Sequence, residues 1–331
     1  MTRGPSLWDA LSDARGRLSR AGVSNASQEA EWLLLHALHI SSATLLAHPE
    51  RTMDGAERER FKALILRRES GEPLQYILGE ATFWGRDFFV GPGVLIPRLD
   101  TETLIEAALS LIPDGRPFTF LDWGTGSGCI AATLLLERPG AFAFMADKSP
   151  DAIEFARRNL ARHRLEGRAR ILFSDGPEDI PLCGQCDLVV SNPPYIPTDA
   201  IPGLMREVRD HEPRLALDGG PDGMDCCRAL LARAPLWLKP GGFLILEVGD
   251  EGQAADLLRA TSNATPLSKF IAGHSHTGGL SEPDNVWTIS RPSDGRASTE
   301  PPPTGGGGLV FLGVIEDRSA IPRCVAWRYL G

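Results

Sequence analysis

Apolar residues recur at intervals of three and four positions over the first seventy residues of the chain. Two such series are Leu11, Ala14, Leu18 and Ala21, and then Phe61, Leu64 and Ile65. This spacing gathers apolar side chains on one face of a helix. Asp54, followed three positions later by Glu57, suits the capping box that starts a helix. The pattern predicts a small helical domain over residues 1–72.

The pattern changes after the Gly-Glu-Pro run at 71–73, which ends the last of these helices. Residues 81–96 are rich in aromatic and β-branched side chains and are interrupted by Gly85 and by the Gly-Pro-Gly run at 91–93. Aromatic and β-branched residues favour strands, and the glycines between them favour turns. Residues 73–97 are therefore predicted to form a β-hairpin connector.

From residue 98 onward, short buried-strand runs alternate with polar or helical segments. The runs are 118–123, 141–147, 169–174, 187–191 and 242–248. This alternation is typical of an α/β domain with a mostly parallel sheet, here spanning residues 98–331. Two further runs, 309–315 and 324–329, flank a turn and are predicted to complete the sheet as an antiparallel edge. Residues 262–308 are rich in Ser, Thr, Pro and Gly, which predicts a flexible insertion.

Composition places the chain among globular proteins. Of its 331 residues, 42% are hydrophobic and 23% charged, enough to bury a core and form more than one domain. Because there is neither a run of eighteen apolar residues nor a signal-peptide pattern, a cytoplasmic protein without membrane contact is expected. The net charge of −9 argues against a broad phosphate-binding surface, so direct nucleic-acid binding is not expected. Cys183-x-x-Cys186 has no second cysteine pair nearby, so no metal site is expected.

A glycine-rich segment at 124–128 lies between a predicted strand and a predicted helix. Glycines let the backbone approach a ligand closely, so a nucleotide-like ligand is expected at Gly124, Thr125, Gly126, Ser127 and Gly128. The spacing is Gly-x-Gly-x-Gly, not the Gly-x-Gly-x-x-Gly of dinucleotide folds. The preceding Asp122 would repel a pyrophosphate but suit a cationic ligand. An oxidoreductase is therefore disfavoured.

Two carboxylates follow the next two strands. Asp147 occupies the place where a carboxylate accepts hydrogen bonds from both hydroxyls of a ribose. Ser149 and Pro150, directly after it, suit a helix start, because Ser caps free amides and Pro fits the first turn. Asp175, next to Gly176, is placed to contact an adenine amino group, a role common in S-adenosylmethionine sites.

The tetrapeptide Asn192-Pro193-Pro194-Tyr195 closes the fourth strand and carries most of the functional information. The two prolines restrict the backbone, so the loop is stiff. It can aim the Asn192 side-chain oxygen and the Pro193 carbonyl at the two N–H bonds of one planar NH₂ group. Tyr195 can stack on that group and hold its plane for in-line attack on a sulfonium methyl. An amide and an adenine satisfy these requirements equally well.

The first and fourth strands of a doubly wound sheet meet at the topological switch point, so both motifs are expected to face one cleft. A rigid turn leaving a strand is the structural alternative for the tetrapeptide. For Glu247, at the end of the fifth strand, a structural hydrogen bond is favoured over a general base, because an amide nitrogen gains acidity as it is alkylated.

These residues resemble the HemK/PrmC family of glutamine N5-methyltransferases. Besides the two motifs, residues 71–79 (GEPLQYILG) and 95–102 (LIPRLDTE) look like the family's linker and pre-sheet signatures, which DNA adenine methyltransferases lack. The resemblance implies a Rossmann-like, seven-stranded class I methyltransferase domain behind a small helical domain that helps dock the substrate. Two residues depart from the family pattern: Trp123 stands where Leu is common, and Gly176 where an aromatic residue is common.

The resemblance also assigns roles to the motif residues. It implies that residues 124–128 contact S-adenosylmethionine, that Asp147 binds its ribose and that Asn192 touches both ligands. Pro193, Pro194 and Tyr195 would complete the glutamine site, with Arg98 and Glu102 bordering the cleft.

The resulting hypothesis is methyl transfer from S-adenosylmethionine to the glutamine of the Gly-Gly-Gln tripeptide in class-1 peptide-chain release factors, by a monomer. The alternatives in the same chemistry are a glutamine of another protein, such as a ribosomal protein, and adenine N6. An S-adenosylmethionine-binding assembly protein without catalytic activity is the alternative from a different class. The intact acceptor loop argues against it, because mere binding would not need this loop.

Overall fold

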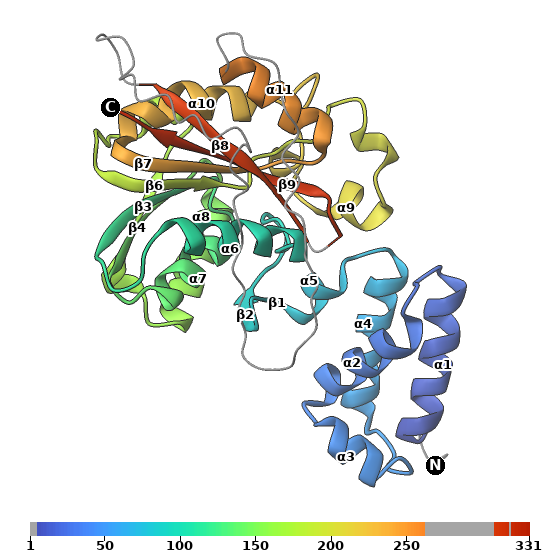
Figure 1. The fold of residues 1–331 in the computed structure, drawn as a ribbon. Coiled ribbons are helices and arrows are strands. Elements are labelled where there is room, and N and C mark those ends of the chain that lie inside the picture. Colours follow the sequence, from blue (N-terminus) through green and yellow to red (C-terminus); the bar gives the residue numbers. More distant parts are fainter. Residues whose placement is uncertain (1–4, 262–307, 318) are drawn as a thin grey trace, which may run out of the picture. The chain divides into compact units, whose positions relative to one another are not determined.

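The computed structural model describes residues 5–261, 308–317 and 319–331, and it divides into two compact units (Figure 1). The first unit contains the chain up to Ala81, together with Phe89–Pro92 and Gly203–Glu212. The second contains Thr82–Phe88, Gly93–Pro202 and the chain from Pro213. The predicted insertion at 262–308 lies outside the described residues except for Gly308.

The first unit is helical, as the sequence predicts. Its helices are α1 (Leu7–Arg20), α2 (Ala26–Leu38), α3 (Ser42–Ala47), α4 (Gly55–Glu69), α5 (Leu74–Leu78) and α9 (Arg206–His211). The buried faces of α1, α2 and α4 form one apolar core. The capping box at Asp54 and Glu57 is confirmed: the Glu57 N–H donates to Asp54 Oδ1 at 2.7 Å, and the Asp54 N–H donates to Glu57 Oε2 at 3.0 Å.

Arg68 joins α9 to the other helices of the first unit. Its side chain is only 3% exposed. Its Nε donates to Glu29 Oε2 of α2 at 2.5 Å, and its Nη2 donates to Glu207 Oε1 of α9 at 2.6 Å. Because a buried charge is costly without partners, these two carboxylates are needed to hold Arg68 in place.

Within the predicted connector at 73–97, the hairpin is present as β1 (Glu80–Phe83) and β2 (Arg86–Phe89), which form a two-stranded sheet. The start of this range forms the helix α5 instead, which the prediction of a hairpin did not include. Its turn residues Trp84 and Gly85 both have positive φ, 52° and 67°. A tryptophan rarely adopts this conformation. Here it is stabilised by two hydrogen bonds, from the Trp84 N–H to Glu102 Oε1 at 2.8 Å and from the indole Nε1 to Glu137 Oε1 at 3.0 Å.

The second unit contains a seven-stranded sheet in the order β5-β4-β3-β6-β7-β9-β8. The strands are β3 (Phe118–Trp123), β4 (Ala141–Asp147), β5 (Ala169–Phe173), β6 (Cys186–Ser191), β7 (Leu238–Glu247), β8 (Leu309–Glu316) and β9 (Pro322–Tyr329). The first five strands pair in parallel, whereas β9 is antiparallel to both β7 and β8. The predicted α/β class and antiparallel edge are therefore confirmed.

One strand begins earlier than predicted. β7 starts at Leu238, four residues before Gly242, and includes Pro240 and Gly241. Its pairing with β6 is irregular there, because Cys186 faces Leu238 whereas Leu188 already faces Phe243. A bulge of this kind tolerates a proline and glycines, which sequence patterns assign to a turn.

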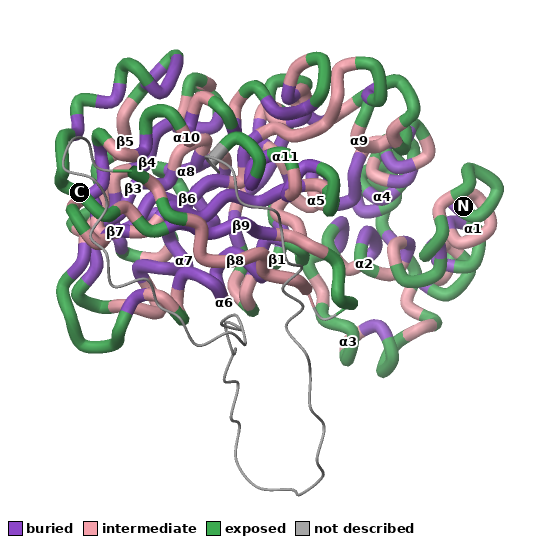
Figure 2. The backbone as a smooth tube through the Cα atoms, turned by 45° about the horizontal axis from the view of Figure 1, so that its top comes forward, coloured by how far each residue is buried: buried purple, intermediate pink, exposed green. Residues whose placement is uncertain are grey.

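Helices cover both faces of the sheet. One apolar core joins it to α6 (Glu102–Leu111), α7 (Cys129–Glu137) and α8 (Pro150–Arg162). A second core joins the opposite face to α10 (Asp225–Trp237) and α11 (Glu251–Thr261). The central strands are consequently buried along most of their length (Figure 2). In the part of the chain that the structure describes, no helix is long and apolar enough to cross a membrane.

Candidate active site

The carboxyl ends of β3 and β6 lie side by side in the sheet. Phe120 pairs with Leu188 and Asp122 with Val190, so the two segments that follow these strands begin next to each other. The Ser191 hydroxyl donates to the Trp123 carbonyl at 2.7 Å. The prediction that the first and fourth strands meet at the switch point is confirmed.

The loop after β3 needs glycine on geometric grounds. Gly124, Gly126 and Gly128 have φ values of 69°, 56° and 79°, which side chains disfavour. A Cβ on Gly128 would also lie 2.8 Å from the Met145 Cε and 3.3 Å from Ala156 of α8. Because Gly128 has no side chain, the first turn of α7 can pack against Met145 of β4 and Ala156 of α8. The preceding residues, 124–127, line a cavity.

Asp122 lies beneath this loop. Its Oδ2 accepts hydrogen bonds from the Thr125 hydroxyl at 2.6 Å and from the Ala131 N–H at 3.2 Å. Its Oδ1 has no partner among the described residues, and burial raises the pKa of this carboxyl to about 7. Asp122 does not line the cavity. The carboxyl instead joins the loop to the first turn of α7.

Asp147, at the end of β4, holds the glycine loop from the other side. The Gly126 N–H donates to Asp147 Oδ2 at 2.9 Å, and the Ser149 N–H donates to Asp147 Oδ1 at 2.9 Å. Burial raises the pKa of this carboxyl above its usual value. Each oxygen keeps a further lone pair for another donor. The predicted helix start is confirmed, since Ser149 caps α8 and Pro150 is its first residue.

These elements surround a cavity of about 400 Å³. Ten of the residues predicted for the site line it: Arg98, Gly124, Thr125, Gly126, Ser127, Asp147, Asp175, Gly176, Asn192 and Pro194. Gly128, Pro193 and Tyr195 do not line it. Glu102, expected at its border, is also absent from the lining, because its carboxylate accepts the Trp84 N–H at the hairpin turn.

Glu178 lines the cavity without having been predicted. Its carboxylate occupies the space next to Gly176, where a Cβ would lie 2.4 Å from Glu178 Oε1. The Ser174 hydroxyl donates to the Gly176 carbonyl at 2.6 Å and holds this turn. Gly176 thus makes room for the acidic side chain of Glu178.

Sequence reasoning also missed a wall of the cavity contributed by the chain between 213 and 229. Pro213, Leu215, Ala216, Asp218, Asp225, Cys226 and Ala229 lie in this wall. The Gly-Gly-Pro-Asp-Gly run at 219–223 was the available signal, since such a cluster marks a tight turn. A Cβ on Gly219 would lie 2.6 Å from the Pro194 carbonyl oxygen, and one on Gly223 would lie 2.2 Å from that of Tyr195.

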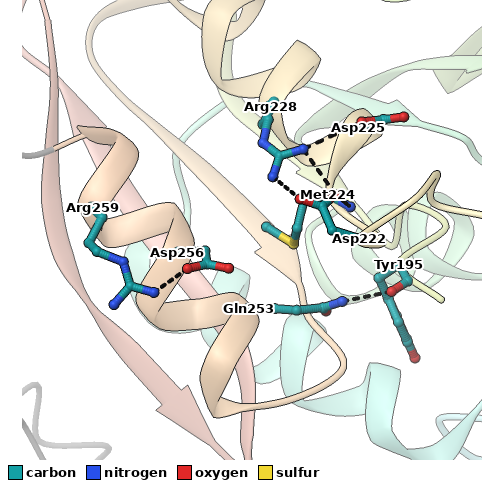
Figure 3. Close-up of polar contacts among 8 residues, drawn as sticks. All are labelled: Tyr195, Asp222, Met224, Asp225, Arg228, Gln253, Asp256 and Arg259. Carbon is teal, nitrogen blue, oxygen red and sulfur yellow. Dashed lines mark hydrogen bonds and ion pairs between the residues drawn. The ribbon is translucent and has the colours of Figure 1, made fainter. Parts of the chain in front are cut away.

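The backbone of the Asn-Pro-Pro-Tyr loop is held by α11 (Figure 3). Gln253 Nε2 donates to the Tyr195 carbonyl at 2.7 Å, and Gln253 Oε1 accepts the Gly249 N–H at 2.9 Å. The neighbouring turn is closed by Asp222, whose Oδ1 accepts the Met224 N–H at 3.1 Å and whose carboxylate pairs with Arg228 (Figure 3). The loop is therefore supported by polar contacts on its backbone.

A buried cluster lies behind the acceptor side chains. Asn192 Nδ2 donates to Thr101 Oγ1 at 3.0 Å. Glu247 Oε2 is buried and has no hydrogen-bond partner among the described residues. The Tyr195 hydroxyl donates to Glu247 Oε1 at 3.4 Å. Burial raises the pKa of Glu247 to about 7 and also raises the pKa of the Tyr195 phenol, so Tyr195 stays protonated at neutral pH. Thr101 lines the cavity and was not predicted.

Two domain families match the chain. Residues 9–79 match the PrmC N-terminal domain, and residues 98–206 match the methyltransferase small domain. Within 5–261, 308–317 and 319–331, no group of three or more His, Cys, Asp or Glu side chains could hold a metal ion.

Curated relatives match most of the chain. It is 45% identical over 276 residues to the release factor glutamine methyltransferase of Geobacter sulfurreducens, covering 82% of this chain and 95% of the relative. The protein of the same name from Moorella thermoacetica is 46% identical over 258 residues, covering 77% and 90%. That from Nitratidesulfovibrio vulgaris is 42% identical over 263 residues, covering 80% and 88%. The chain belongs to the release factor glutamine methyltransferase family.

Proposed function

We propose that this protein transfers a methyl group from S-adenosylmethionine to the side-chain amide nitrogen of the glutamine in the Gly-Gly-Gln tripeptide of class-1 peptide-chain release factors. The observation that carries the proposal is the orientation of Asn192, which lines the cavity and directs its Nδ2 to Thr101. Its Oδ1 is thereby left as an acceptor for a substrate N–H. The substrate itself is inferred from the names of the relatives.

The residues around the cavity fit S-adenosylmethionine. When bound, this cofactor supplies an electrophilic methyl group on a sulfonium. The glycine loop at 124–128 offers a wall without side chains, and Asp147 keeps a lone pair on each oxygen for the ribose hydroxyls. Asp175 and Gly176 would border the adenine, with the Glu178 carboxylate beside them.

The acceptor loop would hold the glutamine by its amide. Asn192 Oδ1 and the Pro193 carbonyl would accept the two N–H bonds, and Pro194 and Arg98, which line the cavity, would border the amide plane. Tyr195 does not line the cavity, so its ring would have to reach the amide from the edge of the loop. In this arrangement the residues of the loop would orient the amide nitrogen for attack on the methyl group that the cofactor supplies. An amide nitrogen becomes more acidic as it is alkylated, so its proton can leave without a strong base.

We propose separate roles for three segments of the chain. We assign residues 1–72 to docking of the release factor, 73–97 to a connector and 98–331 to catalysis. The protein would act as a monomer in the cytoplasm, where release factors are found.

The decisive experiment incubates the protein with isotopically labelled S-adenosylmethionine and a purified class-1 release factor, followed by peptide mass spectrometry. We expect one methyl group on the glutamine of Gly-Gly-Gln, and none on a control factor whose glutamine is replaced by alanine. An unlabelled glutamine would reject the proposal. A ribosomal protein and adenine-containing DNA in parallel reactions test the other substrates with the same chemistry.

The variant Asn192→Ala separates catalysis from cofactor binding. It removes the acceptor oxygen but leaves the glycine loop and Asp147 unchanged. We expect turnover to be lost while the affinity for S-adenosylmethionine, measured by calorimetry, is retained. A wild-type protein that binds the cofactor but methylates nothing in the panel would favour the assembly-protein alternative.

A further inference from the structure

We propose that the Glu178 carboxylate, which lies beside Gly176, accepts a hydrogen bond from the 6-amino group of the cofactor's adenine. The site would thereby select adenine over a purine that has oxygen at the same position. This inference rests on the proposed function and deepens it, because it names a residue that distinguishes one base from another. The sequence predicts a contact with the amino group for Asp175, and Glu178 is a further acceptor that the sequence pattern does not mark.

The segment that follows β5 lies where the base of a bound nucleoside would extend. The strands β4 and β5 end side by side, and the Ser174 N–H donates to the Asp147 carbonyl at 3.1 Å. Asp175, Gly176 and Glu178, which come directly after this contact, line the cavity. A base attached to a ribose at the Asp147 carboxylate would therefore lie along this segment.

The backbone of the segment is held in place by hydrogen bonds and by burial. The Ser174 hydroxyl donates to the Gly176 carbonyl at 2.6 Å, and the Asp179 N–H donates to the same carbonyl at 3.1 Å. Ser174, Gly176 and Pro177 are buried, whereas the Glu178 side chain is exposed. The turn therefore fixes the point from which Glu178 reaches the cavity.

Gly176 leaves the space that the carboxyl of Glu178 occupies. Its φ and ψ of −156° and 170° are extended, a conformation that any residue can adopt, so the backbone does not require glycine. A Cβ at this position, however, would have Oε1, Cδ and Oε2 of Glu178 all within 2.7 Å. The missing side chain at position 176 is therefore what allows the carboxyl to lie at the wall of the cavity.

The chemistry of a carboxylate suits the 6-amino group of adenine. Within residues 5–261, 308–317 and 319–331, Glu178 has no hydrogen-bond or ion-pair partner, so its oxygens are available to a ligand. A carboxylate only accepts hydrogen bonds, and the amino group of adenine donates. A purine with oxygen at position 6 would place an acceptor against an acceptor. This unfavourable pairing gives the selection.

The test measures the binding of two compounds by calorimetry. One is S-adenosylhomocysteine, which remains after methyl transfer, and the other is S-inosylhomocysteine, in which oxygen replaces the 6-amino group. We expect the wild type to bind the adenine compound about tenfold to a hundredfold more tightly, the usual value of a hydrogen bond to a charged group. Glu178→Gln keeps the size of the side chain but adds an NH₂ that can donate to the oxygen of inosine. It should bind the inosine compound more tightly than the wild type does and reduce the preference for adenine about tenfold.

Two neighbouring acids serve as controls. Asp179 is exposed on the same turn and does not line the cavity, so Asp179→Asn should keep both Kd values within about twofold. Asp175→Asn tests the other carboxylate that lines this part of the cavity. If Asp175→Asn abolishes the preference for adenine while Glu178→Gln leaves it unchanged, Asp175 is the discriminating acceptor and the proposal is rejected.

Gly176→Ala tests whether the space beside the glycine matters. The backbone accepts alanine, but the added methyl group would displace the Glu178 carboxyl from the wall. We expect Gly176→Ala to weaken the binding of S-adenosylhomocysteine as much as Glu178→Ala does. In a protein that already carries Glu178→Ala, no carboxyl remains to be displaced, so the second change should cost little more. Losses that add fully in the double variant would overturn the proposed arrangement.

These measurements need neither turnover nor a release factor, so the two proposals can fail separately. If the wild type methylates no release factor but shows a preference for adenine that Glu178→Gln reduces, only the proposed function fails. If it methylates the release factor but has no preference, or keeps its preference in Glu178→Gln, only this inference fails. A wild type that binds neither compound would overturn both.

Discussion

Gly126 donates its backbone N–H to Asp147 Oδ2 at 2.9 Å, so the glycine loop and the carboxylate proposed for the ribose are already joined within the protein. Ser149 binds the other oxygen in the same way. Both oxygens of Asp147 must therefore act as acceptors toward the backbone, whatever else they bind.

Asp147→Asn tests this double role. The NH₂ of the asparagine amide must face the backbone N–H of either Gly126 or Ser149, so two donors oppose each other. The variant also has one oxygen fewer to accept a ribose hydroxyl. We expect affinity for S-adenosylmethionine to fall by about tenfold to a hundredfold, the usual value of a hydrogen bond to a charged group. Calorimetry measures this, with the exposed Asp179→Asn as control. An unchanged Kd would remove Asp147 from the cofactor site.

The buried carboxyl of Asp122 should make the free energy of unfolding depend on pH. Burial raises its folded-state pKa from 3.8 to about 7, so the folded state holds a proton that the unfolded state releases. The stabilising contribution of Asp122 is complete below the pKa of the unfolded state. It is lost as the pH rises through the pKa of the folded state. Between pH 5 and pH 8, we expect the wild type to lose roughly 3 kcal/mol more unfolding free energy than Asp122→Asn, which cannot ionise. Urea unfolding at both pH values measures the difference, and parallel losses in the two proteins would contradict it.

Arg68 and Arg67 form a matched pair on α4. Arg68 is buried between Glu29 and Glu207, whereas the exposed Arg67 pairs with Glu72. Replacing Arg68 by methionine leaves two carboxylates without their cation and should cost about 3–5 kcal/mol of unfolding free energy. Arg67→Met breaks an exposed pair and should cost less than about 1 kcal/mol. Equal effects in denaturant unfolding would show that burial of Arg68 does not matter.

Gly223→Ala tests the support of the acceptor loop. Its Cβ would lie 2.2 Å from the Tyr195 carbonyl oxygen, so the loop must move. Gly184→Ala is the control, because it shares a positive φ but has open space around it. The control should lose about 1 kcal/mol of stability and keep its activity. Gly223→Ala should lower kcat at least about tenfold, as a displaced reacting group does. Normal methylation of the release factor by Gly223→Ala would show that the loop tolerates displacement.

The sequence predicts the parts of this protein that depend on local pattern. The strands at Phe118–Trp123 and Ala141–Asp147 have the predicted bounds, because a buried parallel strand is a short apolar run ended by polar or glycine-rich residues. The neighbouring positions of β3 and β6 were also predictable, from the general topology of doubly wound sheets.

What could not be predicted depends on which side chains the fold brings together. Thr101 and Asn192 are 91 positions apart, and no periodicity relates them. The sequence indicates an acid next to the ligand site at Asp122, but not that its side chain turns toward Thr125 and Ala131 under the loop. Glu102 was placed at the cleft border, but the hairpin turn at Trp84 provides it with a closer donor. In each case strand and helix positions were predictable and the direction of the side chain was not.

The participation of Gly203–Glu212 in the first unit limits how this protein can be divided. A fragment ending at Ala81 would contain Arg68 and Glu29 but not Glu207, and would carry a buried cation with half of its counter-charge. The helical unit is thus not a contiguous module at the N-terminus. A chimera that exchanges it between relatives would have to transfer the segment around α9 as well, even though more than a hundred residues of catalytic sequence lie between the two pieces.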